Sequence, residues 1–333
     1  MSVHVNPATA TAGEQQVVAA PPAPAGGRRR RGRFAFLSRW DIKVSPYVYV
    51  APFFLLFAAF GVYPMLYTLF VALQKWTLGS DIRLNIGGHN FVELWHDDAF
   101  WNSVFNTFGL FVFATVPQLL GALVLANLLN RINFGRTFFR LAVVIPVATS
   151  TAVVGIVFNQ LYSTDFGIVN WLLHLVGVHP VDWHSSQPGS WFAIVTMVNW
   201  RWTGYNALIY LAAMQAIPKD LYESASLDGA SATRQFFRIT IPMLRPTIIF
   251  TVIISTIGGI QLFGEPVTFK TGAGSMQGGT TGQFQTVTMY LYQEMFERQR
   301  LGYAGAIAWV IVLLTALTVL INFTLVRRIN SDK

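Results

Sequence analysis

The sequence contains no cysteine, which excludes disulfide bonds, thiolate metal ligands and cysteine nucleophiles. Charged residues are also scarce: they make up 11% of the 333 residues, against about 25% in a typical soluble protein. Hydrophobic residues account for 53% of the chain and aromatic residues for 14%. A chain with so little charge lacks the polar surface of a soluble fold, so we expect a membrane protein.

Sequence motifs of enzymatic chemistry are missing as well. The chain has no Walker-type sequence, no HExxH motif, no Ser–His–Asp arrangement and no pair of carboxylates within one apolar run. The glycine-rich run TGAGSMQGGTTG (271–282) lacks the Lys-Ser/Thr ending of a phosphate-binding loop. His174, His179 and His184 do not follow helical metal-ligand spacing, and Pro180 interrupts them. We therefore expect no enzyme, no metal site and no cofactor bound by this chain.

Six apolar runs are long enough to cross a bilayer core of about 30 Å as helices. They lie at about 46–75, 103–129, 139–161, 190–214, 244–265 and 303–326. These runs leave no room for a large soluble domain. The prediction is an all-α, polytopic membrane protein with six transmembrane helices.

Basic residues gather in four clusters along the chain. The clusters are Arg28–Arg33 with Arg39 and Lys43; Arg131, Arg136 and Arg140; Lys219, Arg234, Arg238 and Arg245; and Arg327, Arg328 and Lys333. With six spans, all four clusters fall on one side of the membrane. The positive-inside rule then places both termini and residues 218–246 in the cytoplasm. Contacts with anionic lipid explain the net charge of +8 better than nucleic-acid binding does.

The N-terminal part of the chain differs from the rest. Its first 27 residues are rich in Ala, Pro, Gly and Val and show no helical periodicity, and an arginine run follows. We predict a disordered, arginine-rich cytoplasmic tail over 1–43 and a transmembrane domain over 44–333. The first apolar run is too long for the core of a signal peptide, so we expect it to be retained.

The fourth apolar run carries a stripe of polar and aromatic side chains. Asn199, Trp202, Thr203, Asn206 and Tyr210 follow the helical spacing i, i+3, i+4, i+7 and i+11. Polar side chains in a membrane span face protein or water rather than lipid. The stripe therefore either lines a cavity or forms hydrogen bonds with a neighbouring helix.

Arg201 lies near the middle of the same run, where an uncompensated charge costs about 2.5–3.5 kcal/mol. Its helical phase is nearly opposite to the stripe, which favours a structural ion pair. Glu265, predicted on one face of the fifth run together with Gln261, is the acidic residue best placed to offset Arg201. We hypothesise that Gln261 and Glu265 border the cavity, with Asn159 as a further candidate from the third run.

The segment 218–246 is polar and lies between two apolar runs. It is predicted to form two short helices separated by Gly229, with Ser231 capping the second helix over 232–240. Pro242 and Pro246 are expected to stop that helix and redirect the chain. Phe236, Phe237 and Ile239 give the second helix an apolar side that suits a groove on a partner protein.

The spacing within this segment resembles the EAA motif of ATP-binding-cassette (ABC) importer permeases. Glu223-Ser224-Ala225 is followed after three residues by Gly229, and after nine more by Ile239-Thr240-Ile241-Pro242. Ser224 replaces the usual Ala, and Ile241 the usual Leu. The resemblance implies the transmembrane domain of a type I importer, in which this segment forms coupling helices that seat in a cleft of an ATPase subunit. The residues implied in coupling are Glu223, Ser224, Ala225, Asp228, Gly229, Phe236, Phe237, Ile239 and Pro242.

The resemblance extends over about residues 45–330. The runs FGRTFFR, DFGIVNW, WRWTGYNALIYLAAMQAIPKDLYESA and STIGGIQLFGEP resemble the carbohydrate-uptake branch of these importers, and within it the first permease of cellobiose-type (β-glucoside) systems. This implies a multi-pass protein of the bacterial cell membrane that forms a heterodimer with a second, homologous permease. It further implies an ATPase dimer that uses ATP and Mg on the cytoplasmic side, and an extracellular or periplasmic sugar-binding protein.

Other functions stay open at this point. The substrate of such a permease could be another disaccharide or a glycerol phosphate. A stand-alone secondary transporter would need titratable residues in its spans, where only Arg201 and Glu265 qualify. A membrane receptor would carry a cytoplasmic signalling domain, which this sequence does not show.

Overall fold

The computed structural model describes residues 34–331, apart from residues 133 and 271–273. Most of the predicted tail, residues 1–33, lies outside the described residues. The chain divides into two compact units, 1–61 and 62–333, and each is described by itself.

The first unit contains α1 (Phe34–Phe57), which leads into a π-helical turn, η1 (Ala58–Val62). α1 begins inside the segment 1–43 that we predicted to be disordered. Between Phe34 and Pro46 the sequence has neither Gly nor Pro, so nothing in it stops the helix from extending upstream. The π-helical turn lies just before Pro64, whose missing N–H removes one helical hydrogen bond.

The second unit is almost entirely helical. Its long helices are α4 (Asp98–Arg131), α8 (Gln187–Gln215), α12 (Arg245–Ile260) and α15 (Leu301–Ser331). Its shorter α-helices are α2 (Tyr63–Ala72), α3 (His89–Trp95), α5 (Arg136–Ala148), α6 (Thr151–Leu161), α7 (Ile168–Leu175), α9 (Lys219–Leu227), α10 (Ala232–Gln235), α11 (Ile241–Met243), α13 (Gly264–Phe269) and α14 (Val287–Tyr292). Two π-helical turns, η2 (Phe236–Thr240) and η4 (Gln293–Glu297), and a 3-10 turn, η3 (Ser275–Gln277), complete the helices.

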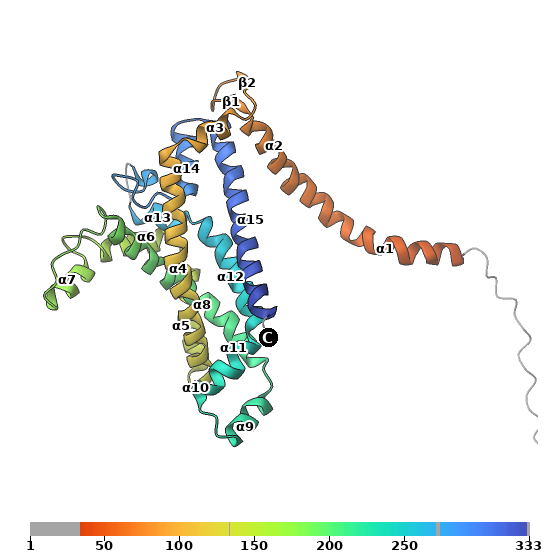
Figure 1. Ribbon diagram of the computed structural model, residues 1–333, viewed down its shortest axis with the longest axis vertical. Helices are drawn as coiled ribbons and strands as arrows, with labels where there is room; N and C mark the ends of the chain where they lie inside the picture. The colour runs from red at the N-terminus through yellow and green to blue at the C-terminus, as the bar shows by residue number, and fades with distance from the viewer. Residues whose placement is uncertain (1–33, 133, 271–273, 332–333) are drawn as a thin grey trace, which may run out of the picture. The chain divides into compact units, whose positions relative to one another are not determined.

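A small antiparallel sheet pairs β1 (Gln74–Trp76) with β2 (Arg83–Asn85), with Lys75 opposite Leu84. This hairpin, α3 and α14 lie at one end of the unit, and α9 and α10 lie at the other (Figure 1). We call these the outer and the inner end, following the orientation predicted from the basic residues.

The described helices account for the predicted spans in two ways. Three stretches, Val44–Ala72, Asp98–Arg131 and Leu301–Thr324, are long and apolar enough to cross a membrane without a break. Two further pairs of helices are apolar enough together but are bent at a break: α5 and α6 meet at 93°, and the helix over 232–243 meets α12 at 68°. In the second pair, α12 covers most of the fifth predicted run. α8 is 29 residues long, but its polar side chains give it a lower mean hydropathy than that of the three unbroken stretches.

The fifth predicted run, 244–265, is not one helix. α12 ends at Ile260, and Glu265 belongs to the separate helix α13. The prediction that Gln261 and Glu265 share a face of one helix is therefore wrong. The cause is local: Pro266 has no N–H for a continuing helix but fits the first turn of a new one.

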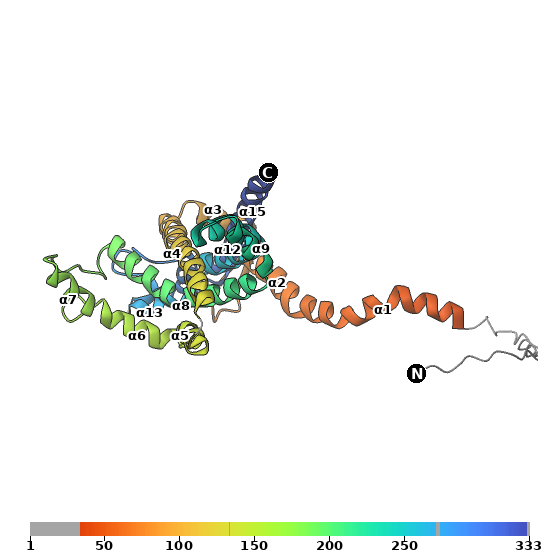
Figure 2. The same cartoon turned by 90° about the horizontal axis from the view of Figure 1, so that it is seen from below.

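The packing of α4 against α8 forms the centre of the second unit (Figures 1 and 2). Small buried side chains mark the contact, among them Ala114, Ala122 and Ala126 on α4 and Ala193 and Ala207 on α8. Small residues let two membrane helices approach closely, which strengthens their van der Waals contact. α5 and α12 pack on this central pair.

Gly204 sets the approach of α8 to α5. A Cβ atom there would strike the backbone carbonyl oxygen of Val143 on α5. We expect Gly204→Ala to lower the free energy of unfolding by about 1–3 kcal/mol, since overpacking forces the backbone to shift. Gly258→Ala is the control, because a Cβ atom there meets no atom of the described chain within 4 Å. Denaturant unfolding of both variants in detergent would test this, and equal stability would contradict the expectation.

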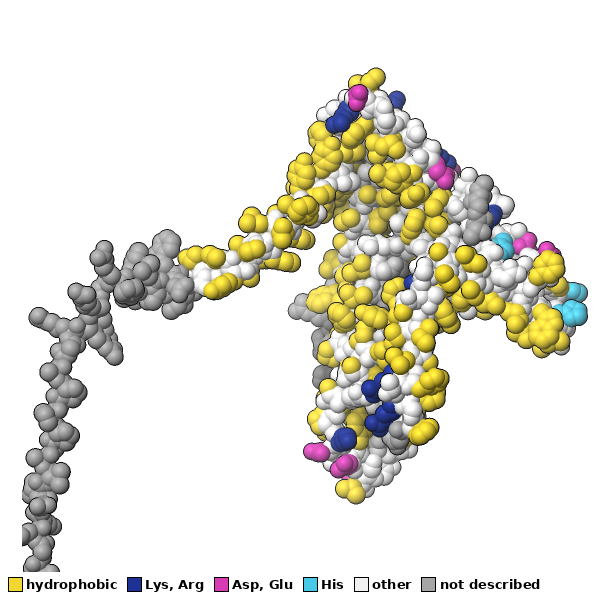
Figure 3. Space-filling view, turned by 180° about the vertical axis from the view of Figure 1, so that it is seen from behind, with side chains coloured by type: hydrophobic (Ala, Val, Ile, Leu, Met, Phe, Trp, Pro, Cys, Tyr) yellow, Lys and Arg dark blue, Asp and Glu magenta, His cyan; other side chains and the backbone are white. Residues whose placement is uncertain are grey.

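Hydrophobic side chains cover much of the visible face of the second unit, and its charged side chains gather near the two ends (Figure 3). Phe113 and Leu120 on α4 and Leu313 on α15 are all more than half exposed. An exposed apolar belt on long helices is what lipid contact requires, because lipid offers no hydrogen bonds to polar groups.

Candidate functional site

A cavity of about 420 Å³ lies among α4, α8, α12 and the segment 261–265. The face of α8 that lines it consists of Val198, Arg201, Trp202, Tyr205 and Asn206. These positions follow the spacing i, i+3, i+4, i+7 and i+8, so they form one face of the helix. Pockets that hold small molecules commonly have about 300–1,000 Å³, so the cavity has the size of a ligand site.

Arg201 forms a buried ion pair in the cavity wall. Its Nη1 lies 2.6 Å from Glu265 Oε1, and the two side chains are 9% and 7% exposed. The same carboxylate oxygen accepts a hydrogen bond of 3.1 Å from Trp202 Nε1. Arg201 Nη2 lies 3.5 Å from the carbonyl oxygen of Thr149, at the break between α5 and α6. The ion pair that we hypothesised from the sequence is thus present in the structure.

The position of Arg201 differs from the prediction in one respect. We expected it nearly opposite the polar stripe, but it lines the same cavity as Trp202 and Asn206. The cavity-facing side of α8 is turned from the stripe by roughly one residue step, which is about 100° on a helix. A helix with polar groups on two faces does not reveal from its sequence which one its neighbours leave open.

The other predicted path residues divide into two groups. Trp202, Asn206, Gln261 and Glu265 line the cavity. Asn199 donates to the carbonyl oxygen of Val195 on its own helix, Tyr210 shares a hydrogen bond of 2.6 Å with Thr251 on α12, and Asn159 donates to the carbonyl oxygen of Phe269. Tyr210 and Asn159 thus connect neighbouring helices, Asn199 bonds within α8, and none of the three contributes to the cavity wall.

Several cavity residues were missed in the sequence. They are Phe111, Thr115 and Gln118 on α4, Tyr205 on α8 and Ser255 on α12. Gln118 had a detectable signal, because it is an amide inside an otherwise apolar run. Phe111 had none, since a phenylalanine facing the cavity looks the same in sequence as one that faces lipid.

At the inner end, α9 finishes in a glycine turn. Gly229 has a φ of 74°, a left-handed conformation that glycine adopts at little cost. The N–H of Ala230 donates to the carbonyl oxygen of Ala225, and the N–H of Gly229 to that of Ser226. This is the Schellman pattern of a helix end. Ser231 then caps the next helix, because its hydroxyl accepts from the N–H of Arg234.

The second helix of this segment is longer than predicted. It continues through α10, the π-helical turn η2 and α11 to Met243, so Pro242 does not stop it. Pro242 instead lies in the first turn of α11, where it replaces an N–H that the preceding π-helical turn leaves free. The bend follows at Leu244, which is buried, and Pro246 lies in the first turn of α12.

Two contacts brace α9 against the second helix. The hydroxyl groups of Tyr222 and Thr240 are 2.9 Å apart, and Gln235 Nε2 donates to Ser226 Oγ over 2.9 Å. We call residues 219–243 the inner arm. On it, Leu227 is 90% and Phe237 is 60% exposed.

The remaining predicted coupling residues lie along the inner arm. Glu223, Ser224, Asp228, Gly229 and Pro242 are exposed, whereas Ala225, Phe236 and Ile239 are half-buried. Phe236 packs toward the cluster around Leu129, Tyr210 and Leu244. The apolar side expected of Phe236, Phe237 and Ile239 is therefore divided: Phe237 faces outward and Phe236 faces the bundle.

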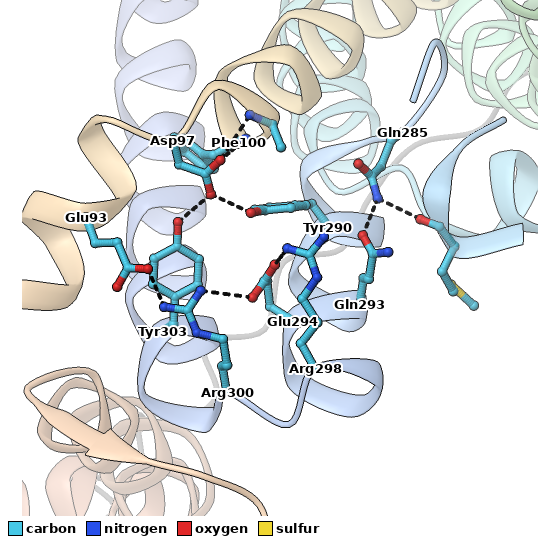
Figure 4. A network of polar contacts seen from close by, with 12 residues as sticks. Glu93, Asp97, Phe100, Gln285, Tyr290, Gln293, Glu294, Arg298, Arg300 and Tyr303 are labelled. Atoms are coloured by element: carbon cyan, nitrogen blue, oxygen red, sulfur yellow. Dashed lines mark hydrogen bonds and ion pairs between the residues drawn. The ribbon is translucent and has the colours of Figure 1, made fainter. Parts of the chain in front are cut away.

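A polar network at the outer end was not anticipated from the sequence. Asp97 accepts hydrogen bonds from the hydroxyl groups of Tyr290 and Tyr303, and buried Glu294 pairs with Arg298 and Arg300 (Figure 4). Arg300 also pairs with Glu93 on α3. The network connects the start of α4 to α3, to α14 with η4, and to α15.

Burial alone would raise the pKa of Asp97. Hydrogen bonds from Tyr290, Tyr303 and the N–H groups of Phe100 and Ala99 outweigh this effect and lower its pKa below the ordinary value of 3.8. Because the pKa is lowered on folding, Asp97 stabilises the fold above pH 3.8, and this stabilisation is lost as the pH falls through the lowered value.

Asp97→Asn should lower the free energy of unfolding by about 1–2 kcal/mol at pH 7, since bonds to a charged acceptor are lost at a half-exposed site. It should also flatten the acid side of the stability profile. Denaturant unfolding between pH 3 and 7 measures both effects, with exposed Asp98→Asn as the control. A variant with an unchanged acid profile would show that Asp97 does not carry the linkage.

The family description "Binding-protein-dependent transport system inner membrane component" matches residues 118–332. The chain is 35% identical to the lactose transport system permease protein LacF of Rhizobium radiobacter, over 85% of this chain and 94% of LacF. It is 34% identical to the arabinooligosaccharides transport system permease protein AraP of Halalkalibacterium halodurans, over 82% of this chain and 84% of AraP.

Among solved structures, a bacterial ABC transporter involved in the import of the acidic polysaccharide alginate has a chain with the same fold. The TM-score is 0.73 at 23% identity, over 89% of this chain and 99% of that one. This likeness shows that the two chains share a fold. The chain belongs to the family of binding-protein-dependent transport system inner membrane components, as a multi-pass permease of the ABC sugar-importer type.

Proposed function

We propose that this chain forms half of the translocation path of an ATP-driven importer for a disaccharide or short oligosaccharide, with cellobiose as the first candidate. The observation that carries the proposal is the cavity between α4, α8 and α12. Its wall combines amides (Gln118, Asn206 and Gln261) with aromatic rings (Phe111, Trp202 and Tyr205). Amides match sugar hydroxyl groups, and aromatic faces match the apolar faces of sugar rings.

The position of the inner arm supports coupling to a separate motor. The arm follows α8 and precedes α12 in the chain, and both helices line the cavity. A force on the arm therefore reaches two walls of the cavity through continuous backbone. The hydrogen bonds of Tyr222 and Gln235 keep the two helices of the arm together, so the arm can act as one body.

The proposal includes the partners implied by the EAA-type spacing. An ATPase dimer that hydrolyses ATP with Mg would seat the inner arm, a second homologous permease would supply the other half of the path, and a sugar-binding protein would deliver the substrate at the outer end. The names of the relatives LacF and AraP, which carry lactose and arabinooligosaccharides, support a saccharide substrate.

Saccharide-stimulated ATPase activity of the assembled complex tests this function. The complex, reconstituted with its binding protein, would be assayed against a panel of disaccharides including cellobiose, lactose and maltose. We expect one or more of them to raise ATP hydrolysis several-fold, and the chain alone to import nothing. Import by the isolated chain, or a complex that no saccharide stimulates, would contradict the proposal.

A further inference from the structure

We propose that the Arg201–Glu265 ion pair makes the central cavity selective for uncharged saccharides and against acidic ones. The inference rests on the proposed function, since it concerns the substrate class of the same cavity.

The cavity wall carries no net charge. Among the described residues that line it, Arg201 and Glu265 are the charged ones, and their signs are opposite. They are joined directly, at 2.6 Å, with both side chains almost fully buried. Neither charge is screened by bulk water, so each is offset mainly by the other, and a group that enters the cavity meets a paired dipole and no free charge.

The guanidinium group is already occupied by a carboxylate of the protein. Nη1 donates to Glu265 Oε1, Nη2 approaches the carbonyl oxygen of Thr149, and the buried Nε has no hydrogen-bond partner. Trp202 Nε1 donates to the same carboxylate oxygen and holds it in place. Glu265 thus takes the place at Arg201 that the carboxylate of an acidic sugar would need.

An acidic saccharide would therefore lose its hydration without gaining a free cation, and this disfavours its binding. An uncharged saccharide does not have this problem, because its hydroxyl groups can bond to Gln118, Asn206 and Gln261, which also line the cavity. Discrimination between the two classes then depends on Glu265 remaining charged and bound to Arg201.

Equilibrium binding to the complete transporter in lipid nanodiscs tests the inference. The binding protein is omitted, because it imposes a specificity of its own. The probes are matched pairs: cellobiose, lactose and maltose, each with its counterpart in which a C6 carboxylate replaces the primary alcohol. For the wild type we expect the uncharged member to bind about 100-fold more tightly, as for a buried charge without a partner. Equal binding of the two members would overturn the inference without any variant.

Two variants identify the residues responsible. Glu265→Gln frees the guanidinium group, so the ratio of uronate to neutral binding should rise about 100-fold. The double variant R201Q/E265Q lacks the same carboxylate but also the cation, so its ratio should return to the wild-type value. It also contains no unpaired buried charge, so it serves if Glu265→Gln folds poorly. A double variant that gained uronate binding, or a folded Glu265→Gln with an unchanged ratio, would overturn the inference.

The results also separate this inference from the proposed function. If a neutral disaccharide stimulates the ATPase but both members of its pair bind equally, the function stands and the role of the ion pair is refuted. If no saccharide of either class stimulates the wild-type complex or binds to it, the proposed function fails, and this inference fails with it.

Discussion

Glu265→Leu will lower the free energy of unfolding by about 3–5 kcal/mol, the usual result of removing one partner from a buried ion pair. The reason is that Arg201 stays behind in a wall where its side chain is 9% exposed. Its remaining contacts are a 3.5 Å approach to the carbonyl oxygen of Thr149 and the ring of Trp202, whose centroid lies 5.6 Å from Cζ, and Nε has no hydrogen-bond partner. Denaturant unfolding of the purified protein in detergent micelles measures the loss.

The double variant R201L/E265L should recover most of that stability, because replacing both partners of a buried pair by apolar residues is often neutral or favourable. A half-exposed pair gives the control. Glu93→Gln removes one of the two carboxylate partners of Arg300, at 37–40% exposure, and should cost no more than about 1 kcal/mol. If Glu265→Leu were as mild as Glu93→Gln, the pair would not be holding α8 to α13.

Gly229→Val will reduce saccharide uptake at least about tenfold while the complex still assembles. Gly229 has a φ of 74°, and a left-handed conformation costs an ordinary residue about 1–2 kcal/mol, more when it is β-branched. The strain is relieved when the end of α9 unwinds, and this separates Tyr222 from Thr240. The arm then no longer moves as one body. Uptake and ATPase activity, measured together in proteoliposomes, would show ATP hydrolysis that no longer drives transport.

Gly229→Asn is the matched control, because asparagine is tolerated at left-handed helix ends. A Cβ atom at this position has no atom within 4 Å apart from those of its chain neighbours, so the two variants differ in backbone preference and not in a clash at Cβ. We expect at least half of the wild-type uptake for Gly229→Asn. Full uptake by Gly229→Val would show that the turn does not transmit the force.

Features that depend on neighbouring residues in the chain could be predicted from the sequence. The predicted runs 103–129 and 303–326 correspond to α4 and α15, and their ends lie within a few residues of the ends of these helices. Length and hydropathy define such a span. The glycine turn at Gly229 and the cap at Ser231 follow from backbone preferences of single residues. The pairing of Arg201 with Glu265 joins residues far apart in the chain, but it could also be predicted, because an unpaired charge in a membrane has a high energy.

Features that depend on packing were harder to predict. The break between α5 and α6 falls at Thr149 and Ser150, which are not helix breakers in themselves. The roles of Asn159 and Tyr210 were set by the helix that lies beside each of them. The outer network joins Asp97 to Tyr290 and Tyr303, about two hundred residues later in the chain, and no local spacing indicates such a pairing.

The inner arm connects α8 to α12 in the chain, and both helices line the same cavity. This connection has a consequence for regulation. A solute that favours one distance between these two helices also favours one conformation of the arm. Thermodynamic reciprocity then applies: a protein bound to the arm changes the affinity of the cavity for the solute by some factor. The solute must change the affinity of the arm for that protein by the same factor. The solute and the protein bound to the arm would each act as an allosteric effector of the other, with no separate regulatory site between them.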